Sequence, residues 1–170
     1  MALLHIFDSS DWRIIQTAET RNVYARLPIP DGDSFCPALD GLVQSCGADG
    51  GPPFDRILFE THGTPGRIYF GNNYIDGNFL RACVPRNYTN LTTRDARIYF
   101  NGCNIAEGSA GWDFLYAAAA LFVTPGGGQV FGQTSTGFGN PFNGHVVHLW
   151  GTTRTLFVAY DGSITEQFEQ

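Results

Sequence analysis

The sequence predicts an α/β protein with a mostly parallel central sheet and a C-terminal antiparallel meander. A strand at Ala96–Asn101, a helix over Trp112–Phe122 and a strand at Gln129–Gln133 follow one another along the chain. A strand–helix–strand unit of this kind joins parallel strands of one sheet. The tail, over residues 145–168, instead holds three strand-like runs separated by short turns, and such turns join antiparallel strands.

Six elements are predicted before residue 96 from the spacing of apolar residues. They are strands at Leu3–Phe7, Val23–Leu27 and Asp55–His62, a short extended piece at Arg67–Gly71, and helical segments at Pro37–Cys46 and Ile75–Cys83. In the first helical segment Ala38 and Leu42 fall on one face, and Gly47 ends the helix. The glycine- and proline-rich stretch that follows, residues 47–53, is too short for a domain linker. We therefore expect a single domain spanning residues 1–170.

The strand–helix–strand unit has the clearest pattern. The segment Gly102-Cys103-Asn104 breaks its first strand, and Ser109 is a candidate cap for the helix. Within the helix, Trp112, Leu115, Ala119 and Phe122 fall on one apolar face, which is typical of a helix packed on a sheet. In the tail, the runs His145–Trp150, Arg154–Tyr160 and Ser163–Phe168 complete the predicted fold.

Composition excludes several classes of function. The chain has 10 Lys+Arg, all of them arginine, against 16 Asp+Glu, and its net charge is −6. Binding to phosphate backbones or anionic membranes needs a basic stripe, so we expect no nucleic acid as a partner. The absence of lysine also removes Schiff-base chemistry and a P-loop lysine, although nothing in the sequence explains that absence.

No run reaches the roughly 18 apolar residues of a membrane helix, so we expect no membrane insertion. The N-terminal residues lack the pattern of a signal peptide, which predicts a cytoplasmic protein. Secretion by a route that needs no signal peptide stays open.

The four cysteines do not form a disulfide scaffold or the paired spacing of a zinc site. A Cys36–Cys46 bridge is compatible with the sequence but is not required by it. The motif His145-x-x-His148 resembles a metal-ligand pair, yet residues three apart on a strand point to opposite faces. No metal site is therefore predicted.

Two reactive side chains stand where predicted strands end. His62 precedes Gly63, and Cys103 follows Gly102. The carboxyl ends of parallel strands meet at one edge of a sheet, where functional groups collect. A cysteine nucleophile needs a nearby base, and glycines let backbone N–H groups approach an oxyanion. From these residues alone a buried, unreactive cysteine is the commoner outcome.

Two polar residues lie one step below this pair on the same faces of their strands. Glu60 precedes His62 by two residues, and Asn101 precedes Cys103 by two. Asn101 is a candidate to hydrogen-bond nearby backbone. Glu60 either orients His62 or supplies charge to a specificity pocket, or it pairs with Arg97 as a structural partner; these readings stay open.

Two motifs carry a resemblance to a known family. They are the segment from Ile57 through His62-Gly63-Thr-Pro-Gly66, and the segment from Arg97 through Gly102-Cys103-Asn-Ile-Ala106-Glu-Gly108-Ser-Ala-Gly111. Together they resemble the caspase-like (clan CD) cysteine peptidase superfamily. More closely, they are similar to an uncharacterised bacterial caspase-like domain that has His-Gly-x-x-Gly and Gly-Cys-Asn-x-Ala-x-Gly motifs. The similarity covers about residues 55–135.

The resemblance implies a three-layer α/β/α sandwich that carries a His62/Cys103 dyad at the ends of adjacent strands. In that reading Cys103 is the nucleophile, and His62 gives a proton to the leaving amine. The backbone N–H groups of Gly63 and Cys103 make the oxyanion hole. The family implies a protein or peptide substrate and neither metal nor organic cofactor. The chain would be a hydrolase of the thiol protease class.

Specificity and activation are less defined. In related peptidases the segment equivalent to Gln133–Thr136 lines the specificity pocket, but Arg67, Glu60 and Asp76 offer candidates of both charges. Only residues 108–111 separate the Cys103 strand from its helix, so we expect no activation by cleavage of a linker.

Two classes of function follow. The first is a cysteine endopeptidase, for which Cys103 should alkylate faster than the other cysteines. The alternative is a non-catalytic caspase-like module for protein recognition, or a bacterial effector or toxin domain, for which Cys103→Ala should leave partner binding intact. The sequence leaves the oligomeric state undetermined.

Overall fold

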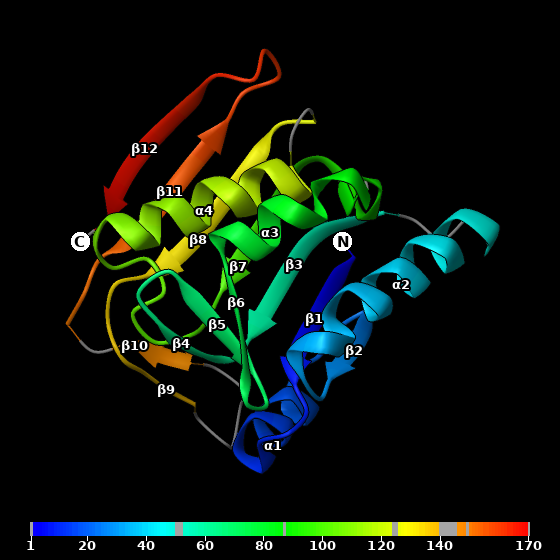
Figure 1. Cartoon of the computed structure of the whole chain (residues 1–170), viewed down its shortest axis with the longest axis horizontal. Helices are drawn as coiled ribbons and strands as arrows, with labels where there is room; N and C mark the ends of the chain where they lie inside the picture. The colour runs from blue at the N-terminus through cyan, green and yellow to red at the C-terminus, as the bar shows by residue number, and fades with distance from the viewer. Residues whose placement is uncertain are drawn as a thin grey trace.

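The computed structural model describes residues 2–49, 53–86, 88–123, 126–139, 146–148 and 150–169. Among these residues, seven strands form one sheet in the order β12-β11-β8-β7-β3-β1-β2 (Figure 1). Their bounds are β1 Leu3–Asp8, β2 Ala25–Ile29, β3 Phe54–Glu60, β7 Thr92–Phe100, β8 Gly128–Gln133, β11 Thr153–Val158 and β12 Ile164–Glu169. The strands from β8 to β2 run parallel, and β11 and β12 are antiparallel to their neighbours. The predicted α/β class with a mostly parallel sheet is confirmed.

Three helices cover the face of the sheet that is turned toward the viewer in Figure 1. They are α2 Phe35–Asp49, α3 Gly77–Cys83 and α4 Gly108–Phe122. Aromatic rings fill the core beneath them: Phe59 and Phe100 stack at 4.7 Å, and Phe114 meets Phe100 edge-on at 4.9 Å. These large buried rings supply much of the apolar area that stabilises the fold.

A further helix, α1 (Trp12–Thr20), lies against β1 from the opposite side. Leu4 and Ile6 of β1 belong to the main core, whereas Phe7 packs with Ile14 and Ala18 of α1. Side chains alternate between the faces of a strand, so α1 covers the other face. The sequence analysis did not predict α1.

Two small antiparallel sheets stand apart from the main one. The first joins β4 His62–Thr64, β5 Arg67–Phe70 and β6 Asn73–Asp76, and the second joins β9 Gly137–Gly139 and β10 Val146–His148. The predicted tail meander is therefore wrong in one respect: β10 pairs with β9 and not with β11. Both edges of β11 are already taken, by β8 and β12, so no edge is left for β10.

Some predicted boundaries also change. The strand predicted to reach His62 ends at Glu60, and His62 begins β4. The helical segment predicted from Ile75 divides into β6 and α3, because Asp76 caps α3 by accepting the Phe79 N–H at 2.9 Å. Ser109 does not cap α4. Glu107 occupies the N-cap position there and makes no side-chain cap bond.

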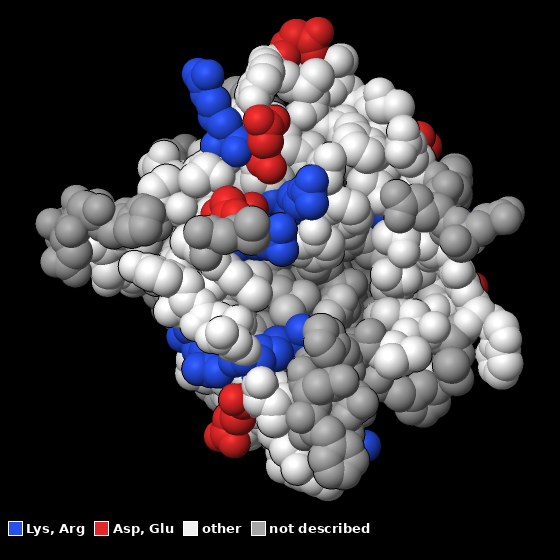
Figure 2. Space-filling model, turned by 180° about the vertical axis from the view of Figure 1, so that it is seen from behind, with Lys and Arg blue, Asp and Glu red and all other residues white. Residues whose placement is uncertain are grey.

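The surface on the far side of the molecule carries mixed charge. In Figure 2 the arginine side chains form separate groups with acidic side chains beside them, and the described residues on this face make no continuous basic stripe. Within the described part of the chain, no helix combines the length and apolar character needed to cross a membrane.

Candidate active site

His62 and Cys103 follow the ends of neighbouring parallel strands. β3 and β7 pair with Leu58 opposite Tyr99 and Phe59 opposite Phe100. The Asn101 N–H donates to the Phe59 carbonyl at 2.9 Å and extends this ladder by one residue. Counting on in the same register brings His62 level with Cys103. The fold therefore brings the two predicted residues to one edge of the sheet.

Gly63 lies directly against the backbone of Cys103. A Cβ atom at position 63 would stand 2.7 Å from the Cys103 carbonyl oxygen and 3.1 Å from its nitrogen. Contacts this short exclude a side chain, so only glycine lets the turn after β3 approach the turn after β7 so closely. The His-Gly and Gly-Cys motifs thus meet in space.

The turn that carries Cys103 is fixed on its other side by the end of β8. The Asn104 N–H donates to the Ser135 carbonyl, and the Ala106 N–H donates to the Gln133 carbonyl, both at 3.0 Å. Asn104 has a φ of 54°, a left-handed conformation that asparagine tolerates better than most residues. The segment 133–136 therefore runs beside the nucleophile candidate.

The Cys103 sulfur has a backbone donor. The Gly137 N–H points at Sγ from 3.3 Å, and the Gly137 carbonyl oxygen lies 3.7 Å from the same sulfur. No described acceptor takes the backbone N–H of Cys103 itself, which leaves this donor available for an oxyanion.

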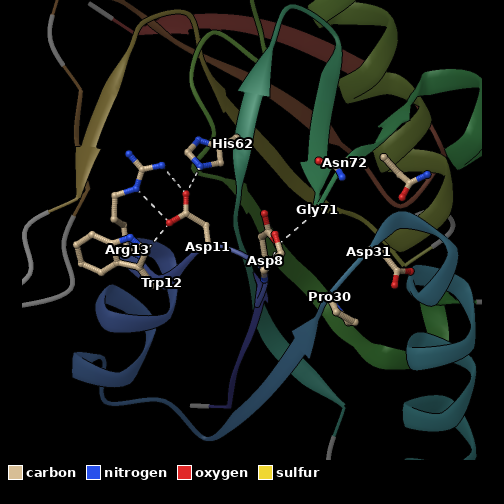
Figure 3. A pocket seen from close by; sticks show the side chains of 11 residues that line it. Asp8, Asp11, Trp12, Arg13, Pro30, Asp31, His62, Gly71 and Asn72 are labelled. Atoms are coloured by element: carbon tan, nitrogen blue, oxygen red, sulfur yellow. Dashed lines mark hydrogen bonds and ion pairs between the residues drawn. The ribbon is translucent and has the colours of Figure 1, made fainter.

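The ring of His62 is held by Asp11, the N-cap residue of α1 (Figure 3). His62 Nε2 and Asp11 Oδ2 are 2.7 Å apart, and the His62 side chain is 52% exposed. Arg13 also reaches Asp11, from Nη2 at 2.6 Å and from Nε at 3.1 Å. The Arg13 guanidinium, with a smaller contribution from His62, holds the pKa of Asp11 far below its usual range. Asp11 is therefore a carboxylate that can orient the His62 ring.

Asp11 was not among the predicted site residues. It lies 51 residues before His62, and only the fold brings the two side chains together. One signal was present: Asp11 stands just after the first predicted strand and so belongs to the same carboxyl edge of the sheet.

Glu60 has structural partners. Its Oε2 lies 2.7 Å from His5 Nε2, and Arg21 donates to both carboxylate oxygens at 3.1 and 3.3 Å. Of the readings left open for Glu60, the pairing with Arg97 is not the one found, because the described partners of Glu60 are His5 and Arg21. The carboxylate beside the His62 ring is that of Asp11. The fold places β1 and the C-terminal end of α1 beside Glu60, and the sequence alone does not show that these segments are neighbours.

The other predicted polar residues have separate positions. The Asn101 side chain makes no hydrogen bond with a described residue. Arg67 lies over the Tyr74 ring, 4.5 Å from its centroid, and Asp76 caps α3 as described above. These contacts do not assign Arg67 or Asp76 to a specificity pocket.

A pocket of about 590 Å³ opens beside His62 (Figure 3). Its lining includes the carboxylates of Asp8, Asp11 and Asp31 together with Arg13. Cys103 is not part of the lining. Asp8 is buried, and its Oδ1 accepts from the backbone N–H groups of Ser10 and Gly71 and from the Ser10 hydroxyl.

No group of three or more His, Cys, Asp or Glu side chains is arranged to hold a metal ion within the described ranges. His148 bonds to the Ser135 carbonyl through Nδ1 at 3.3 Å, and burial lowers its pKa. The second histidine of the motif, His145, lies outside the described residues.

The chain was compared with protein families and with curated proteins. A model described as a domain of unknown function, DUF4347, matches residues 46–124 of the chain. The matched stretch runs from the second half of α2 to just beyond the end of α4 and contains both His62 and Cys103. No protein with a curated description matches the chain.

Proposed function

We propose that this protein is a cysteine endopeptidase of the caspase-like kind, with a Cys103/His62 dyad. The observation that carries the proposal is the contact of Gly63 with the Cys103 backbone, which joins the two strand ends. In this proposal α2, α3 and α4 form one outer layer of a three-layer α/β/α sandwich, and α1 belongs to the other. The substrate is a protein or peptide.

The reaction begins with attack of the Cys103 sulfur on a peptide carbonyl carbon. The carbonyl oxygen becomes an oxyanion, which accepts hydrogen bonds from the N–H groups of Cys103 and Gly63. The C–N bond then breaks, and His62 gives its proton to the leaving amine. Water hydrolyses the resulting thioester, which releases the acid and returns the proton to the dyad.

Asp11 is a positioning residue in this scheme. A carboxylate at one ring nitrogen fixes the tautomer and the orientation of a histidine. Here that carboxylate binds Nε2, so the proton that moves in catalysis would be carried by Nδ1. The Gly137 N–H donates to the sulfur of the other partner, Cys103, and so holds that side chain in place.

The fixed turn around Cys103 supports activity without processing. Two backbone hydrogen bonds tie residues 104 and 106 to the end of β8, and α4 begins at Gly108. A site held in this way needs no chain cleavage to assemble. These 170 residues should therefore be active without cleavage between the strand and the helix.

The test uses the intact chain and a complex peptide mixture. The mixture is incubated with the wild type, with Cys103→Ala or with Cys46→Ala, and new peptide termini are identified by mass spectrometry. We expect new termini with the wild type and with the Cys46→Ala control, and none with Cys103→Ala. Equal termini with and without the Cys103 sulfur would contradict the proposal. A complete lack of termini would assign the dyad to the non-catalytic recognition module.

A further inference from the structure

A second pair of cysteines lies away from the proposed dyad, between two helices. Cys36 is near the start of α2, and Cys83 is the last residue of α3. Their sulfur atoms are 2.8 Å apart, and the two residues are only 8% and 4% exposed. Non-bonded heavy atoms pack at about 3.5 to 4.0 Å, so these sulfurs are closer than ordinary packing brings them.

The neighbouring residues hold the two helices in this arrangement. The Tyr88 hydroxyl reaches the Cys36 carbonyl at 3.2 Å and Asp40 Oδ1 at 2.9 Å. Arg86 forms an ion pair with the same Asp40 carboxylate. The chain that follows Cys83 is thus fastened to α2 by contacts that do not involve sulfur. The juxtaposition of the two thiols is therefore built into the helix packing.

We propose that Cys36 and Cys83 form a disulfide that joins α2 to α3 when the chain folds in the presence of a small-molecule disulfide. A thiolate of the pair attacks the small disulfide, forms a mixed disulfide and releases one small thiol. The second cysteine then attacks the protein-bound sulfur and releases the other small thiol. In total, two protein thiols are oxidised to one disulfide, and one small disulfide is reduced to two thiols.

Burial decides when this exchange takes place. Burial, with the Cys36 thiol as a neighbour, raises the pKa of Cys83 to about 12, so the reactive thiolate is scarce in the folded protein. Exchange is therefore fast while the chain is still open and slow once α2 and α3 are docked. The finished disulfide is protected from reductants by the same burial.

The other cysteines do not compete for this bridge. Cys36 and Cys46 both lie in α2, ten residues apart, which corresponds to about 15 Å along a helix. A disulfide needs Cα atoms within about 7 Å, so the Cys36–Cys46 bridge considered from the sequence is excluded. Cys103 is engaged by Gly137 in the candidate active site. The inference is thus independent of the proposed peptidase activity.

The test refolds the reduced, denatured chain in a mixture of reduced and oxidised glutathione, with refolding in a strong reductant as the comparison. Free thiols are then blocked with N-ethylmaleimide under denaturing conditions and counted by intact mass. We expect two labels per chain after oxidative refolding and four after reductive refolding. Peptide mapping should find Cys36 linked to Cys83, with labels on Cys46 and Cys103.

Stability gives the second readout, because the bridge closes a loop between positions 47 residues apart. We expect the oxidised wild type to melt roughly 5 to 15 °C above the reduced wild type. The matched control Cys46→Ser should keep both the bridge and this difference, whereas Cys36→Ser and Cys83→Ser should lose both. Four labelled thiols after oxidative refolding, a bridge to another cysteine, or equal melting temperatures would overturn the proposal. None of these outcomes depends on whether the chain cleaves peptides.

Discussion

Two histidine–carboxylate pairs of this molecule have the same separation and opposite surroundings. His5 lies 2.7 Å from Glu60, and His62 lies 2.7 Å from Asp11. The first pair is inside the protein, with side-chain exposures of 0% and 4%, while His62 is 52% exposed. The comparison teaches that distance alone does not define a functional histidine. The pairs differ in bonding, because His62 Nε2 is hydrogen-bonded to Asp11 whereas His5 Nε2 makes no hydrogen bond with a described residue. They also differ in where each histidine stands on its strand.

His5 is in the middle of β1, where neighbouring strands and α1 enclose it, and Arg21 completes the charge balance of Glu60. His62 comes just after the end of β3, where the chain leaves the sheet and its ring faces a pocket. A buried charge needs its partners for stability, whereas an exposed strand-end histidine can contact a bound molecule. The predictions below change members of these two pairs or the proposed nucleophile Cys103.

The largest expected effect concerns the dyad. Cys103→Ala and His62→Ala should each lower kcat/KM by at least about 10³-fold, because each removes a group that takes part in bond making or breaking. Thermal melting should change by less than about 2 °C, since neither side chain belongs to the core. The measurement is cleavage of a substrate found with the peptide mixture. Retention of more than a tenth of the activity by either variant would exclude the dyad.

Glu60→Ala should produce the largest loss of stability. It leaves Arg21 and His5 without their buried partner, and breaking such a group costs about 3 to 5 kcal/mol. Chemical unfolding in urea measures this loss, and kcat/KM per folded molecule should stay within about threefold of wild type. A loss below about 1 kcal/mol would show that Glu60 is not a structural anchor.

Asp11→Asn should have the opposite effects, with a loss of activity and little loss of stability. Asparagine keeps the α1 cap but removes the charge that orients His62, so we expect kcat/KM to fall about tenfold with little change in melting temperature. The pH profile of kcat/KM should shift as well, because the substitution removes the negative charge beside the His62 ring. A merely structural role of Asp11 would leave the profile unchanged. Asp11→Glu, which restores the carboxylate, should recover part of the rate. An unshifted profile in Asp11→Asn would remove Asp11 from the mechanism.

The smallest effect concerns acid stability. The pKa of Asp11 is lowered in the folded protein, chiefly by Arg13. The stability that this carboxylate contributes is therefore present above its unfolded pKa of about 3.9, and it is lost as the pH falls through the lower folded value. Asp11→Asn should reduce the free energy of unfolding at pH 7 by about 1 kcal/mol or less. This difference from wild type should shrink below pH 4; a constant difference would contradict the assignment.

The sequence predicted local features well and distant pairings poorly. The β7–α4–β8 unit could be predicted because apolar residues recur at different periods in its strands and in its helix, and glycines separate these elements. The sequence could place His62 and Cys103 at one edge of the sheet because each follows an apolar strand and stands beside a glycine, and their catalytic roles stay a prediction. In contrast, α1 was missed, although Asp11 at its N-cap and the apolar residues Ile14 and Ala18 were available as signals.

Contacts between side chains far apart in the sequence could not be predicted from it. The contacts of Asp11 with His62, Glu60 with Arg21, and Cys36 with Cys83 join positions 39 to 51 residues apart. Each depends on the order β7-β3-β1-β2 in the sheet, and local spacing does not encode that order. The pairing of β10 with β9 likewise depends on β12 taking the free edge of β11.

The activation of Cys103 by His62 is the central claim, and the rate of alkylation tests it most directly. The intact chain is treated briefly with iodoacetamide between pH 5 and 9, and labelling of Cys103 and Cys46 is followed by peptide mapping in the wild type, His62→Ala and His5→Ala. We predict that Cys103 reacts at least about tenfold faster than Cys46 near pH 7 in the wild type and in His5→Ala, and loses that advantage in His62→Ala. Labelling of Cys103 at or below the rate of Cys46 in the wild type, or an advantage that survives His62→Ala, would contradict the account.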